Sequence, residues 1–137
     1  MLERIGVSLE DELLEKFDRF IGRQGYTNRS EAIRDLIREK LVQQEWSRSE
    51  KKTMGVVSIV YDHHTLELSQ KLAELQHDHY ASVVASMHVH LDHDNCLEVL
   101  ILRGKVSEIE ALGNSLISTR GVKHGKLVPT TTGKDLC

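Results

Sequence analysis

The stretch from Gln76 to Glu98, QHDHYASVVASMHVHLDHDNCLE, contains five of the eight histidines and one of the two cysteines of this 137-residue chain. From residue 83 to residue 91, apolar side chains recur at every second position, which is the period of a β-strand, and His88 and His90 fall on the opposite face. The run from 96 to 102 alternates in the same way, so the two runs predict a β-hairpin. We expect its apolar face to be the core, formed by Val83, Ala85, Met87, Val89, Leu91, Leu97, Val99 and Ile101.

The turn of this hairpin decides which side chains share a face. Pairing Asp92 with Cys96 leaves residues 93–95 as a three-residue turn and places Leu91 opposite Leu97. Three metal-binding side chains then share the face away from that core: His88, His90 and Cys96. A lone strand histidine is ordinarily a surface or core residue, and a buried cysteine is ordinarily a small apolar one. Two imidazoles and a thiolate on one face nevertheless favour a site for a borderline-soft divalent ion.

The composition is that of a soluble, globular chain, with 39% hydrophobic and 28% charged residues. No apolar run is long enough to span a bilayer, and the start, MLERIGVS, lacks the apolar region of a signal peptide. We therefore expect a cytoplasmic protein with no membrane contact. The net charge is −3, and residues 1–52 carry eleven basic and eleven acidic side chains. Any contact with nucleic acid must therefore come from local placement of basic groups.

The first fifty residues predict a strand followed by two helices. Residues 4–9 alternate as a short strand does. An apolar helical period follows from Leu13 to Ile21, with Gly25 as a C-terminal stop. A second helix is expected from Asn28, a capping residue with Glu31 three positions later. Because the strand has no neighbour in its own sequence, we expect it to pair with the same strand of a second chain.

Residues 43–53 lose the apolar period and gain charge, so we place a linker there and expect domains at 1–50 and 51–137. Beyond the linker, strands are expected at 56–61, 83–91, 96–102 and 122–128, and helices at 66–75 and 108–118. The order βαββαβ predicts an α+β fold, a ferredoxin-like or ACT-like sandwich with both helices on the apolar face of an antiparallel sheet. The face with the histidines and Cys96 would be free for another chain. From Thr130 on, a mobile tail is expected.

His77 lies before the strand that carries His88 and His90. A strand rises about 3.3 Å per residue, which places the segment from His88 to Cys96 roughly 20 to 25 Å from the start of that strand. His77 would therefore not reach the donors of its own chain. It either has no role or completes a four-ligand site in a neighbouring subunit, which would make metal binding an assembly step.

The order of strand, helix, turn and helix resembles the ribbon-helix-helix DNA-binding dimers. In that family two such strands form an antiparallel ribbon that enters the major groove of double-stranded DNA. The resemblance implies base contacts from Arg4, Gly6 and Ser8. It implies phosphate contacts from Asn28, Arg29 and Ser30 at the start of the second helix. Gly6 departs from related regulators, which generally have a hydroxyl residue there, so base readout would rest more on Arg4, Ser8 and DNA shape.

From Arg4 to about Val128 the chain resembles the nickel-responsive regulators of the NikR family. The resemblance rests on NRSEAIRD at 28–35, QH at 76–77, HVH at 88–90, CLE at 96–98 and RGVKHG at 120–125. It implies a homotetramer, a dimer of dimers, that binds one square-planar Ni(II) per subunit. The implied ligands are His88, His90 and Cys96 of one chain and His77 of the opposing chain. Gln76 and Glu98 would orient the imidazoles, and Glu31 and Asp35 would hold a second, harder cation between domains.

These features predict a nickel-dependent transcriptional repressor of nickel-uptake genes that binds operator DNA and is not an enzyme. The same donors would also suit Cu(II), or Zn(II) in tetrahedral geometry. An alternative is a metal-buffering or delivery protein whose N-terminal unit only dimerises. A zinc hydrolase is disfavoured, because four protein ligands leave no open position for water and no HExxH-like base is present.

Overall fold

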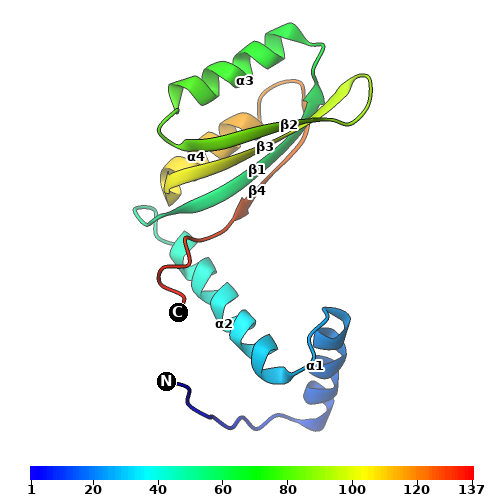
Figure 1. Ribbon diagram of the computed structural model, residues 1–137, viewed down its shortest axis with the longest axis vertical. Coiled ribbons are helices and arrows are strands. Elements are labelled where there is room, and N and C mark those ends of the chain that lie inside the picture. Colours follow the sequence, from blue (N-terminus) through cyan, green and yellow to red (C-terminus); the bar gives the residue numbers. More distant parts are fainter. The chain divides into compact units, whose positions relative to one another are not determined.

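The computed structural model describes residues 1–137, which form two compact units, 1–40 and 41–137 (Figure 1). The division falls within the long helix α2 (Arg29–Trp46). The boundary after residue 50, which the sequence indicates for independent domains, stays a prediction. None of the helices combines the length and the apolar character that a membrane span requires.

The N-terminal unit contains α1 (Asp11–Arg23) and the first part of α2, where the apolar period and the capping signal predict helices. Between the helices Gly25 has a φ of +90°, a left-handed conformation that favours glycine. The Asn28 side chain then accepts a hydrogen bond from the N–H of Glu31 at 2.9 Å, which caps α2. Asn28 therefore has a structural role besides the DNA contact predicted for it.

Residues 1–10 form neither helix nor strand in this single chain. Ile5, Val7 and Leu9 are exposed there, and so are the helix residues Leu13, Phe20, Leu36 and Ile37. A strand needs a hydrogen-bonded neighbour, and the predicted neighbour belongs to a second chain. The two-chain ribbon therefore stays a prediction.

Four antiparallel strands form one sheet in the C-terminal unit, in the order β2-β3-β1-β4. The strands are β1 (Lys52–Asp62), β2 (Val83–His90), β3 (Asn95–Lys105) and β4 (Val122–Pro129). The helices α3 (Leu66–Asp78) and α4 (Val106–Ile117) pack against the same face of this sheet. The predicted βαββαβ order is confirmed, with β1 and β3 longer than their apolar patterns indicate.

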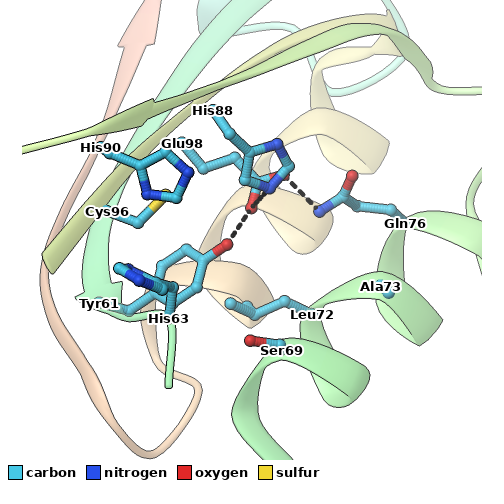
Figure 2. Close-up of a pocket in the computed structure, with 10 residues that line it drawn as sticks. All are labelled: Tyr61, His63, Ser69, Leu72, Ala73, Gln76, His88, His90, Cys96 and Glu98. Atoms are coloured by element: carbon cyan, nitrogen blue, oxygen red, sulfur yellow. Dashed lines mark hydrogen bonds and ion pairs between the residues drawn. The ribbon is translucent and has the colours of Figure 1, made fainter. Parts of the chain in front are cut away.

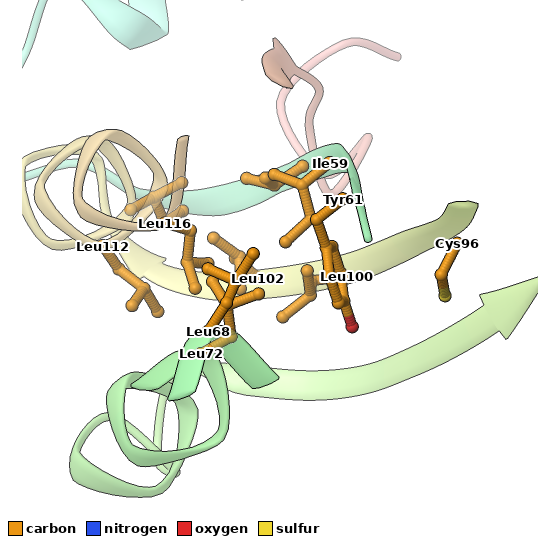
Figure 3. Packing of buried hydrophobic residues seen from close by; sticks show 11 residues of the cluster. Ile59, Tyr61, Leu68, Leu72, Cys96, Leu100, Leu102, Leu112 and Leu116 are labelled. Atoms are coloured by element: carbon orange, nitrogen blue, oxygen red, sulfur yellow. The ribbon is translucent and has the colours of Figure 1, made fainter. Parts of the chain in front are cut away.

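The core lies between the sheet and these two helices (Figure 3). Its buried residues are Val57, Ile59, Tyr61, Leu68, Leu72, Cys96, Leu100, Leu102, Ile109, Leu112 and Leu116. Cys96 is therefore on the covered face of the sheet. Five residues predicted as core are exposed instead, namely Ala85, Met87, Val89, Leu91 and Ile101.

The prediction of which face is core is therefore wrong, and the sequence of β3 explains the error. In NCLEVLILRGK, Val99 and Ile101 make one face apolar, while Leu100 and Leu102 make the other face equally apolar. Alternation separates two faces, but it does not choose between them when both are apolar. The choice depends on where the helices pack, which is a property of the whole unit.

The β2–β3 hairpin has a register two residues away from the predicted one, because Leu97 lies opposite Val89 and Cys96 opposite His90. The loop between these strands is longer than the expected three-residue turn. It is closed by the Asp92 carboxylate, which accepts hydrogen bonds from two backbone N–H groups further along the loop at 2.9 and 2.8 Å. Because the shift is an even number of residues, the predicted sharing of one face by the three metal donors is preserved.

The C-terminal tail packs on the end of α2, so the expectation of a mobile tail is wrong. The indole N–H of Trp46 donates to the carbonyl of Thr130 at 2.8 Å, and the Thr131 hydroxyl donates to Glu45 at 3.0 Å. Further along the tail, Asp135 pairs with Lys51 at 2.6 Å. Polar contacts hold this tail, so no apolar period marks it in the sequence. The helix α2 itself runs to Trp46, into the segment expected to be a linker.

Candidate metal centre

A cavity of about 270 Å³ lies between α3 and the β2–β3 hairpin (Figure 2). Three predicted ligands line it together: His88, His90 and Cys96. The other lining residues are Tyr61, His63, Ser69, Leu72, Ala73, Gln76 and Glu98. The donors therefore lie under α3 and not on the open face of the sheet, where the sequence pattern places them.

The pairing of β2 with β3 positions the donors. His90 lies opposite Cys96, and His88 lies opposite Glu98. Side chains of directly opposite residues have Cβ atoms about 4.5 to 5.5 Å apart. Cys96 is 1% exposed and forms no disulfide. A buried free thiol beside two imidazoles has the chemistry of a ligand set for a late transition metal.

Glu98 is a buried carboxyl group that connects three elements of the site (Figure 2). It accepts hydrogen bonds from the Tyr61 hydroxyl at 2.9 Å and from Nε2 of Gln76 at 2.9 Å. Its Oε1 also lies 3.2 Å from Nε2 of His88. An Nε2–H that donates to Glu98 leaves Nδ1 of the neutral His88 ring free to bind a metal. Glu98 thus lies against one predicted ligand and Gln76 is bonded to Glu98, and the orienting role expected for both residues stays a prediction.

Tyr61 and His63 line the cavity, but sequence reasoning did not include them in the site. Burial, together with the charge of Glu98, raises the pKa of Tyr61, so its hydroxyl remains a hydrogen-bond donor. Nδ1 of His63 is buried without a hydrogen-bond partner. The His63 ring meets the His90 ring edge-on, with centroids 4.8 Å apart. The alternation of β1 places Tyr61 on the same face of the sheet as Ile59. It predicts that Tyr61 points toward the cavity only when it is known which face the helices cover.

His77 is exposed in the last turn of α3 and does not line the cavity. The adjacent Gln76 reaches Glu98, and the next residue of a helix is rotated by about 100°. The sequence predicts that the length of the strand keeps His77 away from the other donors of its own chain. That reason is wrong, because the end of α3 lies beside β3. Orientation, not distance along the strand, keeps His77 out of the cavity of its own chain.

The donor set fits divalent nickel. Two imidazoles and one thiolate from a single chain supply three of the four ligands of a planar ion and leave one position for another donor. Cu(II) accepts the same planar donors, and Zn(II) accepts them in a tetrahedral arrangement. The side chains therefore fit a late transition metal and would not suit a hard cation such as Mg²⁺.

The residues predicted to contact DNA lie in the N-terminal unit. Arg4, Gly6 and Ser8 are exposed in the segment before α1, and Ser30 is exposed at the start of α2. Arg29 makes a two-pronged ion pair with Asp18, with N–O distances of 2.9 and 2.8 Å. A phosphate group would compete with Asp18 for this guanidinium or bind its remaining N–H groups. The DNA contacts themselves remain predictions.

The two carboxyl groups predicted to hold a second cation, Glu31 and Asp35, are one turn apart in α2. Asp35 accepts a hydrogen bond from the Tyr26 hydroxyl at 2.6 Å and pairs with Arg38 at 3.3 Å. Both Asp35 oxygens therefore already have partners within the N-terminal unit. A cation here would compete with those partners, and this second site also stays a prediction.

Two known protein families match the chain. The family described as "NikR C terminal nickel binding domain" matches residues 54–130, and the family described as "Ribbon-helix-helix protein, copG family" matches residues 3–44. Among solved structures, an uncharacterized protein from Thermotoga maritima is similar, with a TM-score of 0.52 and 21% identity. The similarity covers 58% of this chain and 99% of that chain. At this identity the likeness shows the fold alone.

Several curated relatives match along almost their whole length. A protein of Solibacter usitatus is 53% identical, over 98% of this chain and 97% of its own. One from Anaeromyxobacter dehalogenans is 57% identical, over 99% of each chain, and one from Nitratidesulfovibrio vulgaris is 57% identical, over 97% and 96%. Each is described as a candidate nickel-responsive regulator. With both family matches in chain order and relatives this similar, the chain belongs to the NikR family of nickel-responsive regulators.

Proposed function

We propose that the chain is a nickel-dependent, DNA-binding transcriptional repressor of nickel-uptake genes, acts in the cytoplasm, and is not an enzyme. One Ni(II) binds per subunit of a homotetramer, held by His88, His90 and Cys96 of one subunit and by His77 of the partner subunit. The observation that carries this proposal is the single cavity in which the first three donors meet. When bound, the ion supplies a fixed positive centre that holds the four donors and performs no catalytic step.

The position of His77 supports ligation between subunits. It is exposed at the end of α3, while the adjacent Gln76 is bonded to Glu98 inside the cavity. The same helical turn therefore presents one side chain to its own site and one to the outside. An imidazole displayed in this way is available to a second copy whose own cavity lacks a fourth donor.

The open face of the sheet supports assembly into a tetramer. Its exposed apolar residues are Met87, Val89, Leu91, Ile101 and Val128. Met87 is 62% exposed and Leu91 is 52% exposed in the single chain. Adjacent exposed apolar side chains of this size mark an interaction surface. In the proposed tetramer, the C-terminal unit of a second copy of this chain covers this face.

The N-terminal unit supports operator binding. Ile5, Val7 and Leu9 alternate with Arg4, Gly6 and Ser8 in the exposed segment before α1. Pairing this segment with its copy in a second chain turns the apolar set toward the helices, where Leu13 and Phe20 are also uncovered. The other set then faces the major groove.

Glu98 and Gln76 provide a physical connection from the donors to the rest of the chain. His88 lies against Glu98, which accepts a hydrogen bond from Gln76 in the last turn of α3. Fixing His88 therefore also fixes the helix end that displays His77. Nickel bound to these donors therefore favours the arrangement of the tetramer that binds DNA. The coupling is reciprocal, so nickel raises operator affinity by the same factor by which DNA raises nickel affinity.

A mobility-shift titration tests the function directly. Operator affinity is measured for apo protein, nickel-loaded protein and the Cys96→Ala variant with nickel. We expect a coupling of about 5 to 150-fold for the native chain and none for the variant. Equal affinity of apo and loaded protein would contradict the repressor proposal. If nickel bound tightly but no promoter DNA were protected in a footprint, a metal-buffering or delivery protein would be the better description.

An absorption titration tests the donor set. A thiolate-to-metal band of planar Ni(II) should grow to one equivalent per chain and be absent in Cys96→Ala. Without such a band in the native chain, the thiolate would not be a ligand and the proposed site would be wrong.

A further inference from the structure

The helix α2 is anchored in the C-terminal unit by its last residue, Trp46. This residue packs against the hydrophobic core and is the only tryptophan of the chain. Gly55 of β1 leaves room for the indole, because a Cβ there would lie 3.2 Å from Cη2 of Trp46 and 2.9 Å from Cγ2 of Ile109. Val42, one helical turn before Trp46, is buried as well. The end of α2 is therefore part of the packing of the C-terminal unit.

The C-terminal tail crosses this anchor as a strap, which we define as Thr130, Thr131 and Asp135. The carbonyl of Thr130 accepts hydrogen bonds from the indole N–H of Trp46 at 2.8 Å and from the hydroxyl of Thr53 at 3.2 Å. The N–H of Thr130 donates to a carbonyl of β1 at 3.1 Å. The side chains of Thr131 and Asp135 bond to the last turn of α2 and to the residue before β1. The strap thus joins α2 to β1.

The segment between α2 and β1 is also bonded to α4. The N–H of Val106 donates to the carbonyl of Lys51 at 2.9 Å, and the N–H of Ser107 donates to the carbonyl of Ser49 at 3.0 Å. Both donors lie in the first turn of α4, where backbone N–H groups have no partner within the helix. Residues 47–51, part of the predicted linker, are therefore held by the tail and by α4.

One face of β1 connects the anchor with the cavity of the proposed nickel site. Every second residue of the strand is buried on the face that the helices cover: Thr53, Gly55, Val57, Ile59 and Tyr61. At one end Thr53 donates to the strap, and Gly55 lies against Trp46. At the other end the Tyr61 hydroxyl donates to Glu98 in the cavity. β1 is a central strand, hydrogen-bonded on both sides, and rises about 20 Å from Gly55 to Tyr61 at about 3.3 Å per residue.

From these contacts we propose that the strap couples nickel binding to the DNA-binding unit, with Trp46 as the positioning residue. The inference rests on the proposed function, in which nickel raises operator affinity. Coupling between distant sites is carried by packed side chains, hydrogen bonds and rigid secondary structure. The peptide link between the two units lies within α2, so along the chain a change at the cavity reaches residues 1–40 only through the helix end that the strap holds. Without the strap, nickel still binds but no longer changes operator affinity.

Two variants of the full chain loosen the strap in different ways. Trp46→Phe keeps an aromatic ring in the packing but removes the N–H that donates to Thr130. The double variant Thr131→Val, Asp135→Ala keeps Trp46 and removes both side-chain contacts of the strap. Lys134→Ala is the matched control, because Lys134 is an exposed residue of the same tail whose side chain makes none of the strap contacts.

The measurement compares operator affinity with and without nickel, on the promoter fragment that the native protein protects in a footprint. We define the coupling factor as the ratio of these two affinities. It should be about 5 to 150-fold for the native chain and for Lys134→Ala, and close to one for both strap variants. Nickel affinity, followed by the thiolate-to-nickel band, should be native in every variant, which also shows that each one is folded.

The fluorescence of Trp46 tests the strap independently of DNA. In the double variant Thr131→Val, Asp135→Ala, emission should shift to longer wavelength and be quenched more strongly by acrylamide, because the tail no longer covers the indole. Emission and quenching equal to those of the native chain would show that the tail does not cover the anchor, and would overturn the inference.

The coupling role would be disproved if either strap variant kept the native coupling factor, or if Lys134→Ala lost as much coupling as the strap variants. It would also be disproved if nickel affinity fell together with the coupling factor, since the strap would then only support the nickel site. Failure of the proposed function gives a different result. The native chain itself would then show a coupling factor of one, and the coupling role of the strap would fall with it.

Discussion

Replacing Glu98 by glutamine tests whether the buried carboxyl group orients His88, a proposed nickel ligand. Glu98 is 1% exposed. Its carboxyl oxygens lie 2.9 Å from the Tyr61 hydroxyl, 2.9 Å from Nε2 of Gln76 and 3.2 Å from Nε2 of His88. A glutamine has the same shape, but its NH₂ group must face one of these donors. Loss of a partner that orients a metal-binding histidine costs about 10 to 100-fold in metal affinity, which is about 1.4 to 2.7 kcal/mol.

The same substitution should weaken the apo fold. One buried donor would lose its acceptor, which costs about 1 to 3 kcal/mol in the free energy of unfolding. Nickel affinity is measured by competition with a chelator while the thiolate-to-nickel band is followed, and stability is measured by urea unfolding. Glu110→Gln is the control, because Glu110 is an exposed carboxyl group on α4. Native nickel affinity in Glu98→Gln would refute the orienting role, whatever happened to stability.

Three other changes test other parts of the molecule. Asp18→Asn should strengthen operator binding and steepen its salt dependence by about one unit, because Arg29 loses its ion-pair partner and becomes available to phosphate; weaker binding would mean that Asp18 positions Arg29. Gly125→Ala should lower the free energy of unfolding by about 1 to 3 kcal/mol, because a Cβ there would lie 2.7 Å from Cγ1 of Ile117; unchanged unfolding in urea would contradict this packing. Val89→Asp, on the open apolar face, should shift the proposed tetramer toward smaller species in sedimentation experiments. A variant that sediments like the native protein would exclude this face as an interface.

Much of the fold can be predicted from the sequence because its signals are local. The period of two in β2 and β3, the period near 3.6 in α1, and the Asn28 cap each act within a few residues. Two features cannot be predicted in this way. The covered face of the sheet depends on where α3 and α4 pack, because β3 is apolar on both sides, and the tail depends on single polar contacts such as that of Trp46.

In the candidate site, too, the residues placed by local pattern could be predicted, and those placed by long-range packing could not. His88, His90 and Cys96 share a face by strand parity, and parity survives an even shift in register. Tyr61 reaches the cavity from a strand paired with β3, so its place depends on long-range packing. The separation of His77 was predicted for the wrong reason, because strand length says nothing about how α3 folds back beside β3.

The most direct test of ligation across subunits is a complementation titration. Neither His77→Ala nor Cys96→Ala should form the full planar nickel site alone, since the first lacks the donated imidazole and the second lacks the thiolate. When the two variants are co-expressed and purified as mixed tetramers, the planar thiolate-to-nickel band should return at about one site per mixed pair of subunits. A mixture in which the band does not return would contradict a site shared between chains.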